Sequence, residues 1–268
     1  MKCGEEDKVA NYIEITNKDT VGIVRINRPQ TFNAFDLELM SVLATTMVTL
    51  ASDDSVRAVV ITGEGKAFCA GGDLKWAATF PRGAAAAFHE LSARYHQAVQ
   101  EIRRMPKPVI AAINGIAAGG GFALALACDF RVMAKSAVLQ QAYTSNGLSI
   151  DGGGTFSLPR IVGLARALEI AAFDKPIAAE QALAWGLVTT VVEDGQALDE
   201  AMNMARDLIS RSRKSFAWSK LLLTDSFDTS FETQIERERA GLSDCAASPD
   251  GTEGLKAFAE KRKPKFRR

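Results

Sequence analysis

Two glycine-rich loops contain residues that could stabilise a negative charge with backbone groups alone. The first glycine loop is GKAFCAGGDLK (65–75), the second is NGIAAGGGF (114–122), and each follows a short apolar run. The second loop also precedes a predicted apolar helix, and peptide N–H groups at a helix start are unpaired and positively polarised. Such groups favour a developing oxyanion; the alternative for either loop is a tight, closely packed strand-to-helix turn. Neither loop has the spacing of a dinucleotide or phosphate loop.

Three side chains could add proton transfer or nucleophilic attack. Asp151 stands directly before a Gly-Gly-Gly-Thr run, where it could cap a helix or act on a substrate. His96, in the run RYHQAV, is either a packing or surface histidine or a general base. Tyr143 is either an aromatic wall or a hydrogen-bond donor.

Other classes of site are disfavoured. The chain has two histidines, His89 and His96, and four cysteines without metal-ligand spacing. No metal site is therefore expected, and Cys69, Cys128 and His89 are interpreted as structural residues. Lys plus Arg equals Asp plus Glu at 32 each, which argues against a nucleic-acid partner. No apolar signal segment opens the chain, and its longest apolar stretch is interrupted, so we expect a cytoplasmic protein with no membrane span.

The elements that would position these residues alternate between strand and helix, which predicts an α/β fold. Strands are expected at 21–26, 58–61, 109–113 and 130–133. Helices are expected at 37–50, with Asp36 as N-cap, and at 84–104 and 119–127. After Val192 only helices are expected, at 199–210, 215–223 and 231–242. We therefore expect an α/β core at 1–195 and a separate helical region at 196–268.

Six segments, in order along nearly the whole chain, resemble the crotonase (enoyl-CoA hydratase/isomerase) superfamily. They are NRPQTFNAF, ITGEGKAFCAGGDLK, PKPVIAAINGIAAGGGFALALACDFRV, GLSIDGGGTFSLPRIVG, AAEQALAWGLVTTVV and EGLKAFAEKRKPKF. The resemblance implies a ClpP-like spiral of ββα units followed by a helical trimerisation region. It also implies an enzyme acting on acyl-CoA thioesters as a homotrimer or a dimer of trimers, with coenzyme A as part of the substrate and no other cofactor.

The resemblance assigns binding roles to both glycine loops and to the C-terminal segment. It implies that the N–H groups of Gly72 and Gly120 hold the thioester carbonyl. Residues implied along the adenine and pantetheine path are Thr31, Phe32, Ala70, Gly72, Asp73, Leu74 and Lys75. Phe258 and Lys261 are implied to reach the coenzyme A of a neighbouring subunit. From the residues alone, Lys75 could be an ordinary exposed lysine, and the basic run that starts at Lys261 could be a solvated tail.

The sequence departs from a typical family hydratase at both catalytic glutamates, because Ala123 and Tyr143 occupy their positions. Asp151 instead matches the catalytic aspartate of dienoyl-CoA and ring-oxepin isomerases and the nucleophile of 4-chlorobenzoyl-CoA dehalogenases. His96 matches the dehalogenase general base, and Tyr143 a tryptophan near that nucleophile. Gly72 weakens the dehalogenase match, since those enzymes carry an aromatic residue there.

Three functions follow as expectations. The first is isomerisation, in which Asp151 moves a proton while the enolate rests against Gly72 and Gly120. The second is dehalogenation or hydrolysis, in which Asp151 attacks the substrate and His96 activates water. The third is an acyl-CoA-binding or RNA-associated homologue with little catalysis. For the first two, we expect desolvation to raise the pKa of Asp151.

Overall fold

The main sheet of the protein has six strands and is almost entirely parallel. The computed structural model describes residues 12–266, and its strand order in this sheet is β1-β2-β3-β5-β7-β10. Only β1 and β2 pair antiparallel; the other neighbours are parallel. The strands are β1 (Ile13–Lys18), β2 (Val21–Ile26), β3 (Ala58–Gly63), β5 (Val109–Ile113), β7 (Phe130–Ala134) and β10 (Thr190–Val192).

A second sheet takes the strands that lie between those of the first. Its order is β4-β6-β8-β9, formed by β4 (Ala67–Cys69), β6 (Ile116–Ala118), β8 (Val138–Gln140) and β9 (Ile177–Ala178). Along the chain, β3 and β4, β5 and β6, and β7 and β8 each give one strand to each sheet before the next helix. This alternation is the predicted spiral of ββα units.

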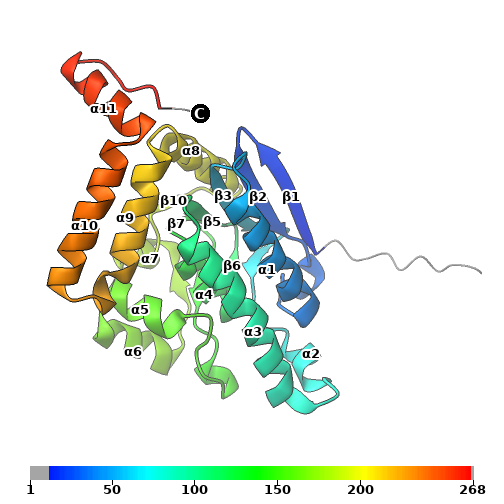
Figure 1. Ribbon diagram of the computed structural model, residues 1–268. Helices are drawn as coiled ribbons and strands as arrows, with labels where there is room; N and C mark the ends of the chain where they lie inside the picture. Colours follow the sequence, from blue (N-terminus) through cyan, green and yellow to red (C-terminus); the bar gives the residue numbers. More distant parts are fainter. Residues whose placement is uncertain (1–11, 267–268) are drawn as a thin grey trace, which may run out of the picture.

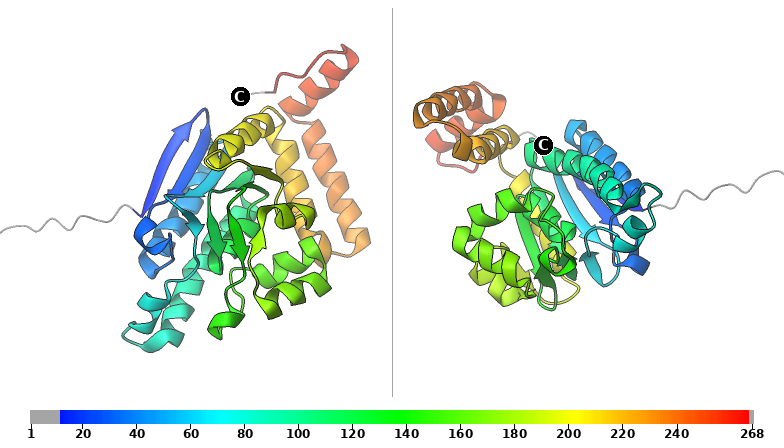
Figure 2. Two further views of the ribbon diagram at one scale, coloured as in Figure 1. Left: turned by 180° about the vertical axis from the view of Figure 1, so that it is seen from behind. Right: turned by 90° about the horizontal axis from the view of Figure 1, so that it is seen from below.

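Helices cover the sheets and continue beyond the last strand (Figure 1). The α-helices are α1 (Leu37–Ser52), α2 (Leu74–Ala78), α3 (Gly83–Arg104), α4 (Gly120–Ala127), α5 (Gly154–Val162), α6 (Leu164–Phe173), α7 (Ala179–Ala184), α8 (Ala197–Ile209), α9 (Arg213–Asp225), α10 (Phe231–Ala246) and α11 (Pro249–Ala259). Short 3₁₀ helices occur at η1 (Pro29–Thr31), η2 (Thr144–Asn146) and η3 (Ser226–Asp228). Helix α1 packs along α3, while α8 packs on β3, β5 and β7. Helices α9 and α10 run along one side of this core, and α11 projects beyond it (Figures 1 and 2).

Hydrophobic patterning explains why the predicted elements form. Every residue of β3 and β5 is buried, as expected for central strands of a parallel sheet covered on both faces. All eight residues of α4 are buried, because this helix is apolar on every side. Helix α1 begins where predicted, and the Asp36 carboxylate accepts the N–H of Leu39 at 2.9 Å.

The sequence did not predict the strands of the second sheet. These strands have only two or three residues each. Such segments are too short to show a period, and their pairing depends on the spiral as a whole. Within residues 12–266 no helix is both long and apolar enough to cross a membrane.

Candidate active site

A cavity of about 290 Å³ opens between the two glycine loops, α3 and the segment that follows β8. Its lining residues are Phe35, Gly72, Phe88, Leu91, Ser92, Tyr95, Gly120, Tyr143, Leu148, Ser149, Ile150 and Asp151. The walls are mainly aromatic and aliphatic, which suits an acyl group. The two glycines, Tyr143 and Asp151 therefore border one space, and Asp151 is the one carboxylate among its lining residues. The other predicted catalytic residue, His96, does not line this cavity.

The glycine loops expose peptide N–H groups at this cavity. Phe35 and Gly72 form a single parallel bridge, in which the N–H of Phe35 donates to Gly71 O and the N–H of Asp73 donates to Phe35 O. This pattern leaves the N–H of Gly72 without an acceptor among residues 12–266. Gly120 opens α4, so its N–H is likewise free of the helical ladder.

The two loops are packed directly against each other. Gly71 has a φ of +89°, and a Cβ built on it would lie 2.8 Å from Ala118 O and 2.9 Å from Gly120 N. Only glycine permits this approach without displacing the second loop. A single oxygen shared by Gly72 N and Gly120 N, at about 3 Å from each, remains a prediction.

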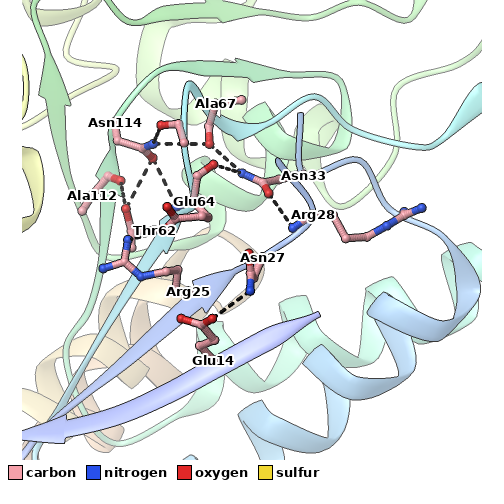
Figure 3. Close-up of polar contacts among 12 residues, drawn as sticks. Glu14, Arg25, Asn27, Arg28, Asn33, Thr62, Glu64, Ala67, Ala112 and Asn114 are labelled. Carbon is pink, nitrogen blue, oxygen red and sulfur yellow. Dashed lines mark hydrogen bonds and ion pairs between the residues drawn. The ribbon is translucent and has the colours of Figure 1, made fainter. Parts of the chain in front are cut away.

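Two asparagine amides hold the start of the first glycine loop (Figure 3). The Asn33 amide donates to Ala67 O at 2.7 Å, and its Oδ1 accepts the N–H of Arg28 at 2.9 Å. From the other side, Asn114 Oδ1 accepts the N–H of Gly63 at 3.1 Å. Asn114 also begins the second glycine loop, so its side chain ties the entry of one loop to that of the other.

Asp151 is held by side chains and does not cap a helix. Its Oδ1 lies 2.6 Å from His96 Nε2, and its Oδ2 accepts the hydroxyl hydrogen of Ser92 at 2.7 Å. The N-cap of α5 is Gly153, with no side-chain cap bond. The structure therefore gives Asp151 a place in the cavity wall, and the capping interpretation is wrong.

The expected direction of the pKa shift of Asp151 is also wrong. Burial is the largest single influence and raises the pKa, as expected. Hydrogen bonds from Ser92, His96 and the Gly152 N–H favour the charged form, and together with the charge of His96 they bring the pKa below its usual value. Ser92 and His96 lie on a helix far away in the sequence, so their effect could not be read from the residues around Asp151.

Tyr143 lies against Asp151 as an aromatic wall with a polar end. Burial raises the pKa of its hydroxyl well above the ordinary value, so the proton stays on the oxygen near neutral pH. The backbone N–H of Asp151 donates to that oxygen. The hydroxyl hydrogen remains available to a substrate, since no residue in the described part of the chain accepts it.

Tyr95 is a site residue that the sequence analysis missed. It is buried, its hydroxyl donates to Gly120 O, and its ring packs 5.3 Å from that of Phe35. A Cβ on Gly152 would lie 2.2 Å from the Tyr95 ring. Tyr95 thus fills the space between the second glycine loop and the turn that carries Asp151. The sequence feature that could have identified Tyr95 is its position directly before His96 on the same predicted helix.

The residues at the two glutamate positions carry no carboxylate toward the cavity. Ala123 is buried within α4, and Tyr143 has a hydroxyl as its only polar side-chain group. Cys69 and Cys128 lie in the interior, where burial raises the pKa of both thiols. His89 is exposed on the surface of α3. No cluster of three metal-ligating side chains occurs among residues 12–266.

The predicted coenzyme A residues fall into two groups in one chain. Thr31 and Phe32 lie beside the first glycine loop, since the N–H of Ala70 donates to Phe32 O at 3.0 Å. Leu74 and Lys75 are exposed at the start of α2, which Asp73 caps.

The second group lies on and just after α11, at the opposite end of the molecule from α2 (Figure 1). Phe258 has 85% of its surface exposed, and Lys261 follows the end of the helix. Neither residue lines the cavity of its own chain.

Comparison with known proteins agrees with this arrangement. The enoyl-CoA hydratase/isomerase family model matches residues 16–268. The 1,2-epoxyphenylacetyl-CoA isomerase of Escherichia coli K12 is 37% identical over 242 residues, covering 90% of this chain and 92% of that protein. A 4-chlorobenzoyl coenzyme A dehalogenase of Arthrobacter sp. is 32% identical, covering 94% of this chain and 91% of that protein. The crystal structure of an enoyl-CoA hydratase from Polaromonas sp. JS666 superposes with a TM-score of 0.91 at 37% identity, covering 95% of this chain and 99% of that one. The chain therefore belongs to the enoyl-CoA hydratase/isomerase family of the crotonase superfamily, and it has the crotonase fold.

Proposed function

We propose that this protein is an acyl-CoA isomerase in which Asp151 is the acid and base. The observation that carries the proposal is the composition of the cavity. Among residues 12–266 it has one lining carboxylate, two glycine N–H groups without an acceptor, and no glutamate at the two hydratase positions. One carboxylate suffices to remove a proton from one carbon and return it to another. The similarity to an epoxyphenylacetyl-CoA isomerase supports this reading.

The proposed reaction balances within the substrate. Asp151 removes the proton next to the thioester carbonyl, and the electron pair moves onto the carbonyl oxygen as an enolate held by Gly72 and Gly120. Two such donors matter, since loss of one typically costs roughly 3 kcal/mol of barrier. The proton then returns from Asp151 to a carbon further along the conjugated chain, and the double bond shifts.

The lowered pKa of Asp151 fits this shuttle. The carboxylate is charged at neutral pH and ready to accept a proton, and once protonated it returns that proton easily. Abstraction is correspondingly harder for so weak a base. The enolate must therefore be stabilised strongly by the two glycine donors.

The test is proton exchange in deuterium oxide, with 3-enoyl-CoA thioesters of straight-chain and aryl-substituted acids as probes. The wild-type protein should move the double bond and, with some of these probes, place deuterium at the α or γ carbon. Asp151→Asn should lower turnover by roughly 100-fold or more, as for loss of a general base. It should keep its affinity for the thioester because the glycine donors remain. Near-full activity in a folded Asp151→Asn protein would reject the proposal.

A second candidate is nucleophilic chemistry, and the contact between His96 and Asp151 favours it. Asp151 would attack an aryl carbon, halide would leave, and water activated by His96 would attack the resulting ester at the Asp151 carboxyl carbon. A single turnover in oxygen-18 water would then leave label in the Asp151 side chain. Isomerisation would leave that side chain unlabelled, so mass spectrometry of the peptide decides between the two.

A binding protein with little catalysis is the third outcome. It would show thermal stabilisation by acyl-CoA thioesters with no turnover of any probe. A ligand at about 100 times its dissociation constant stabilises by roughly 2.7 kcal/mol, which a melting experiment detects.

We further propose a homotrimer or a dimer of trimers, with coenzyme A entering as part of the substrate and no other cofactor. Large apolar side chains are exposed on and beside the C-terminal helices: Leu223, Phe227, Phe231, Leu242, Leu255 and Phe258. An apolar surface of this kind supports association with other copies of the chain. In such an assembly, Phe258 and Lys261 would approach the coenzyme A of a neighbouring subunit.

A further inference from the structure

Helix α3 holds both oxygens of the Asp151 carboxylate. Ser92 and His96 are four residues apart, so they lie on the same face of the helix one turn from each other. Ser92 donates to Oδ2 at 2.7 Å, and His96 Nε2 lies 2.6 Å from Oδ1. The two contacts differ in their surroundings, since Ser92 lines the cavity whereas the His96 side chain is 48% exposed.

We propose that Ser92 is a positioning residue that fixes the plane of the Asp151 carboxylate and favours its charged form before it accepts the substrate proton. The terminal torsion of an aspartate is broad, so a single donor on one oxygen leaves the carboxylate free to rotate. A second donor on the other oxygen removes this freedom and leaves one orientation toward the cavity. The inference rests on the proposed role of Asp151 in the reaction.

Ser92 differs from the other groups that face Asp151 because it does not titrate. The titratable side chains around the carboxylate are His96 and Tyr95 on α3 and Tyr143 after β8; the Gly152 N–H is the remaining donor. The contribution of His96 changes when its ring gains or loses a proton. The hydroxyl of Ser92 donates at every pH, so it favours the charged carboxylate independently of the state of His96.

The experiment compares Ser92→Ala and Ser92→Cys with Ser92→Thr. Alanine removes the donor, cysteine keeps the size but offers only a weak donor, and threonine restores the hydroxyl. Ser41→Ala is the matched control: this helical serine donates only to Leu37 O of its own helix. Protein labelled with carbon-13 at the aspartate carboxyl carbon gives the pKa of Asp151 by NMR, with its signal assigned by its loss in Asp151→Asn. The pH profile of kcat/KM is measured in parallel with the 3-enoyl-CoA probe that turns over best.

Loss of the Ser92 donor should raise the pKa of Asp151, because a bond that favours the charged form has been removed. The acidic limb of kcat/KM should move to higher pH. The value of kcat should fall about tenfold with KM little changed, because the loss of a fixed carboxylate orientation outweighs the gain in basicity. Ser92→Thr should recover both values toward the wild type, and Ser41→Ala should change neither. A purely structural role would lower thermal stability without moving the titration.

The two proposals can fail separately. If Ser92→Ala and Ser92→Cys leave the Asp151 titration and kcat unchanged, the role of Ser92 is wrong, even when Asp151→Asn is inactive. If Asp151→Asn turns over normally, the proposed reaction is wrong, while the NMR titration still decides whether Ser92 controls the carboxylate. Should one of the two variants fail to fold, the other carries the same comparison.

Discussion

His96 Nε2 lies 2.6 Å from Asp151 Oδ1, although the two residues are 55 positions apart in the sequence. The His96 side chain is about half exposed, whereas the carboxylate of Asp151 is about two-thirds covered. The imidazole is therefore more exposed to solvent than the carboxylate that it contacts. His96 could pass a proton from Asp151 to water, or it could activate a water molecule. Isomerisation requires neither role, whereas the nucleophilic reaction requires His96 to activate water.

Replacement of His96 by alanine should separate these reactions. In isomerisation the proton stays with Asp151, so His96→Ala should lower kcat by less than about tenfold and reduce exchange with solvent deuterium. In nucleophilic chemistry the water would lose its base, so turnover should fall by about 100-fold or more, with an Asp151 ester accumulating. Rate measurements combined with mass spectrometry of the intact protein read both outcomes. His89→Ala is the control, since His89 is exposed on the same helix seven residues before His96 and, among residues 12–266, forms no hydrogen bond or ion pair with Asp151.

The two glycine donors should act on the carbonyl of a bound substrate. If Gly72 and Gly120 direct their N–H groups at one oxygen, the carbonyl stretch of a carbon-13-labelled thioester should move to lower frequency on binding, because both donors polarise the bond. Difference infrared spectroscopy measures this shift. Asp151→Asn should preserve it, since the carboxylate is not one of the donors. An unshifted carbonyl in a saturated complex would contradict the proposed enolate site.

The sequence predicts features that belong to one segment, such as a helix cap or a strand, more successfully than contacts between segments that are far apart in the chain. The Asp36 cap and the central strands β3 and β5 are local patterns, and the structure confirms them. Ser92 and Tyr95 were missed because their importance depends on how α3 lies against Asp151. That packing is a tertiary relationship with no local signal. The pKa of Asp151 was placed on the wrong side of its usual value for the same reason, because two of its donors, Ser92 and His96, reach it only through the packing of α3.

Tyr95 sets the separation between the second glycine loop and Asp151, so a change at Gly152 should disturb both. Gly152 and Gly153 have φ values of +63° and +75°, and alanine at either should cost about 1 kcal/mol in backbone strain. Only at Gly152 would the added Cβ meet the Tyr95 ring, at 2.2 Å, whereas Gly153 has no neighbour closer than 3.9 Å.

We therefore expect Gly152→Ala to lower the free energy of unfolding by roughly 1–3 kcal/mol more than Gly153→Ala, because the ring is buried and has little room to move. Its turnover should also fall further. Denaturant melts and kcat measurements on the pair provide the comparison. Equal losses in the two variants would show that Tyr95 does not constrain this turn.

The C-terminal residues Phe258 and Lys261 do not line the cavity of their own chain. Phe258 is exposed on α11, and Lys261 stands in a left-handed turn with a φ of +53° just after it. If this segment serves a neighbouring subunit, Lys261→Gln should weaken coenzyme A binding by about tenfold, because a charged contact to phosphate is lost. Phe258→Ala should weaken binding as well, and deletion from Glu253 onward should also loosen the assembly. Calorimetry with coenzyme A and sedimentation velocity measure the two effects.

Lys263→Gln is the matched control, since it removes the same charge from the same basic run. Equal affinities for the Lys261 and Lys263 variants would indicate a solvated tail, and an assembly unchanged by the deletion would place the subunit contacts on the other C-terminal helices.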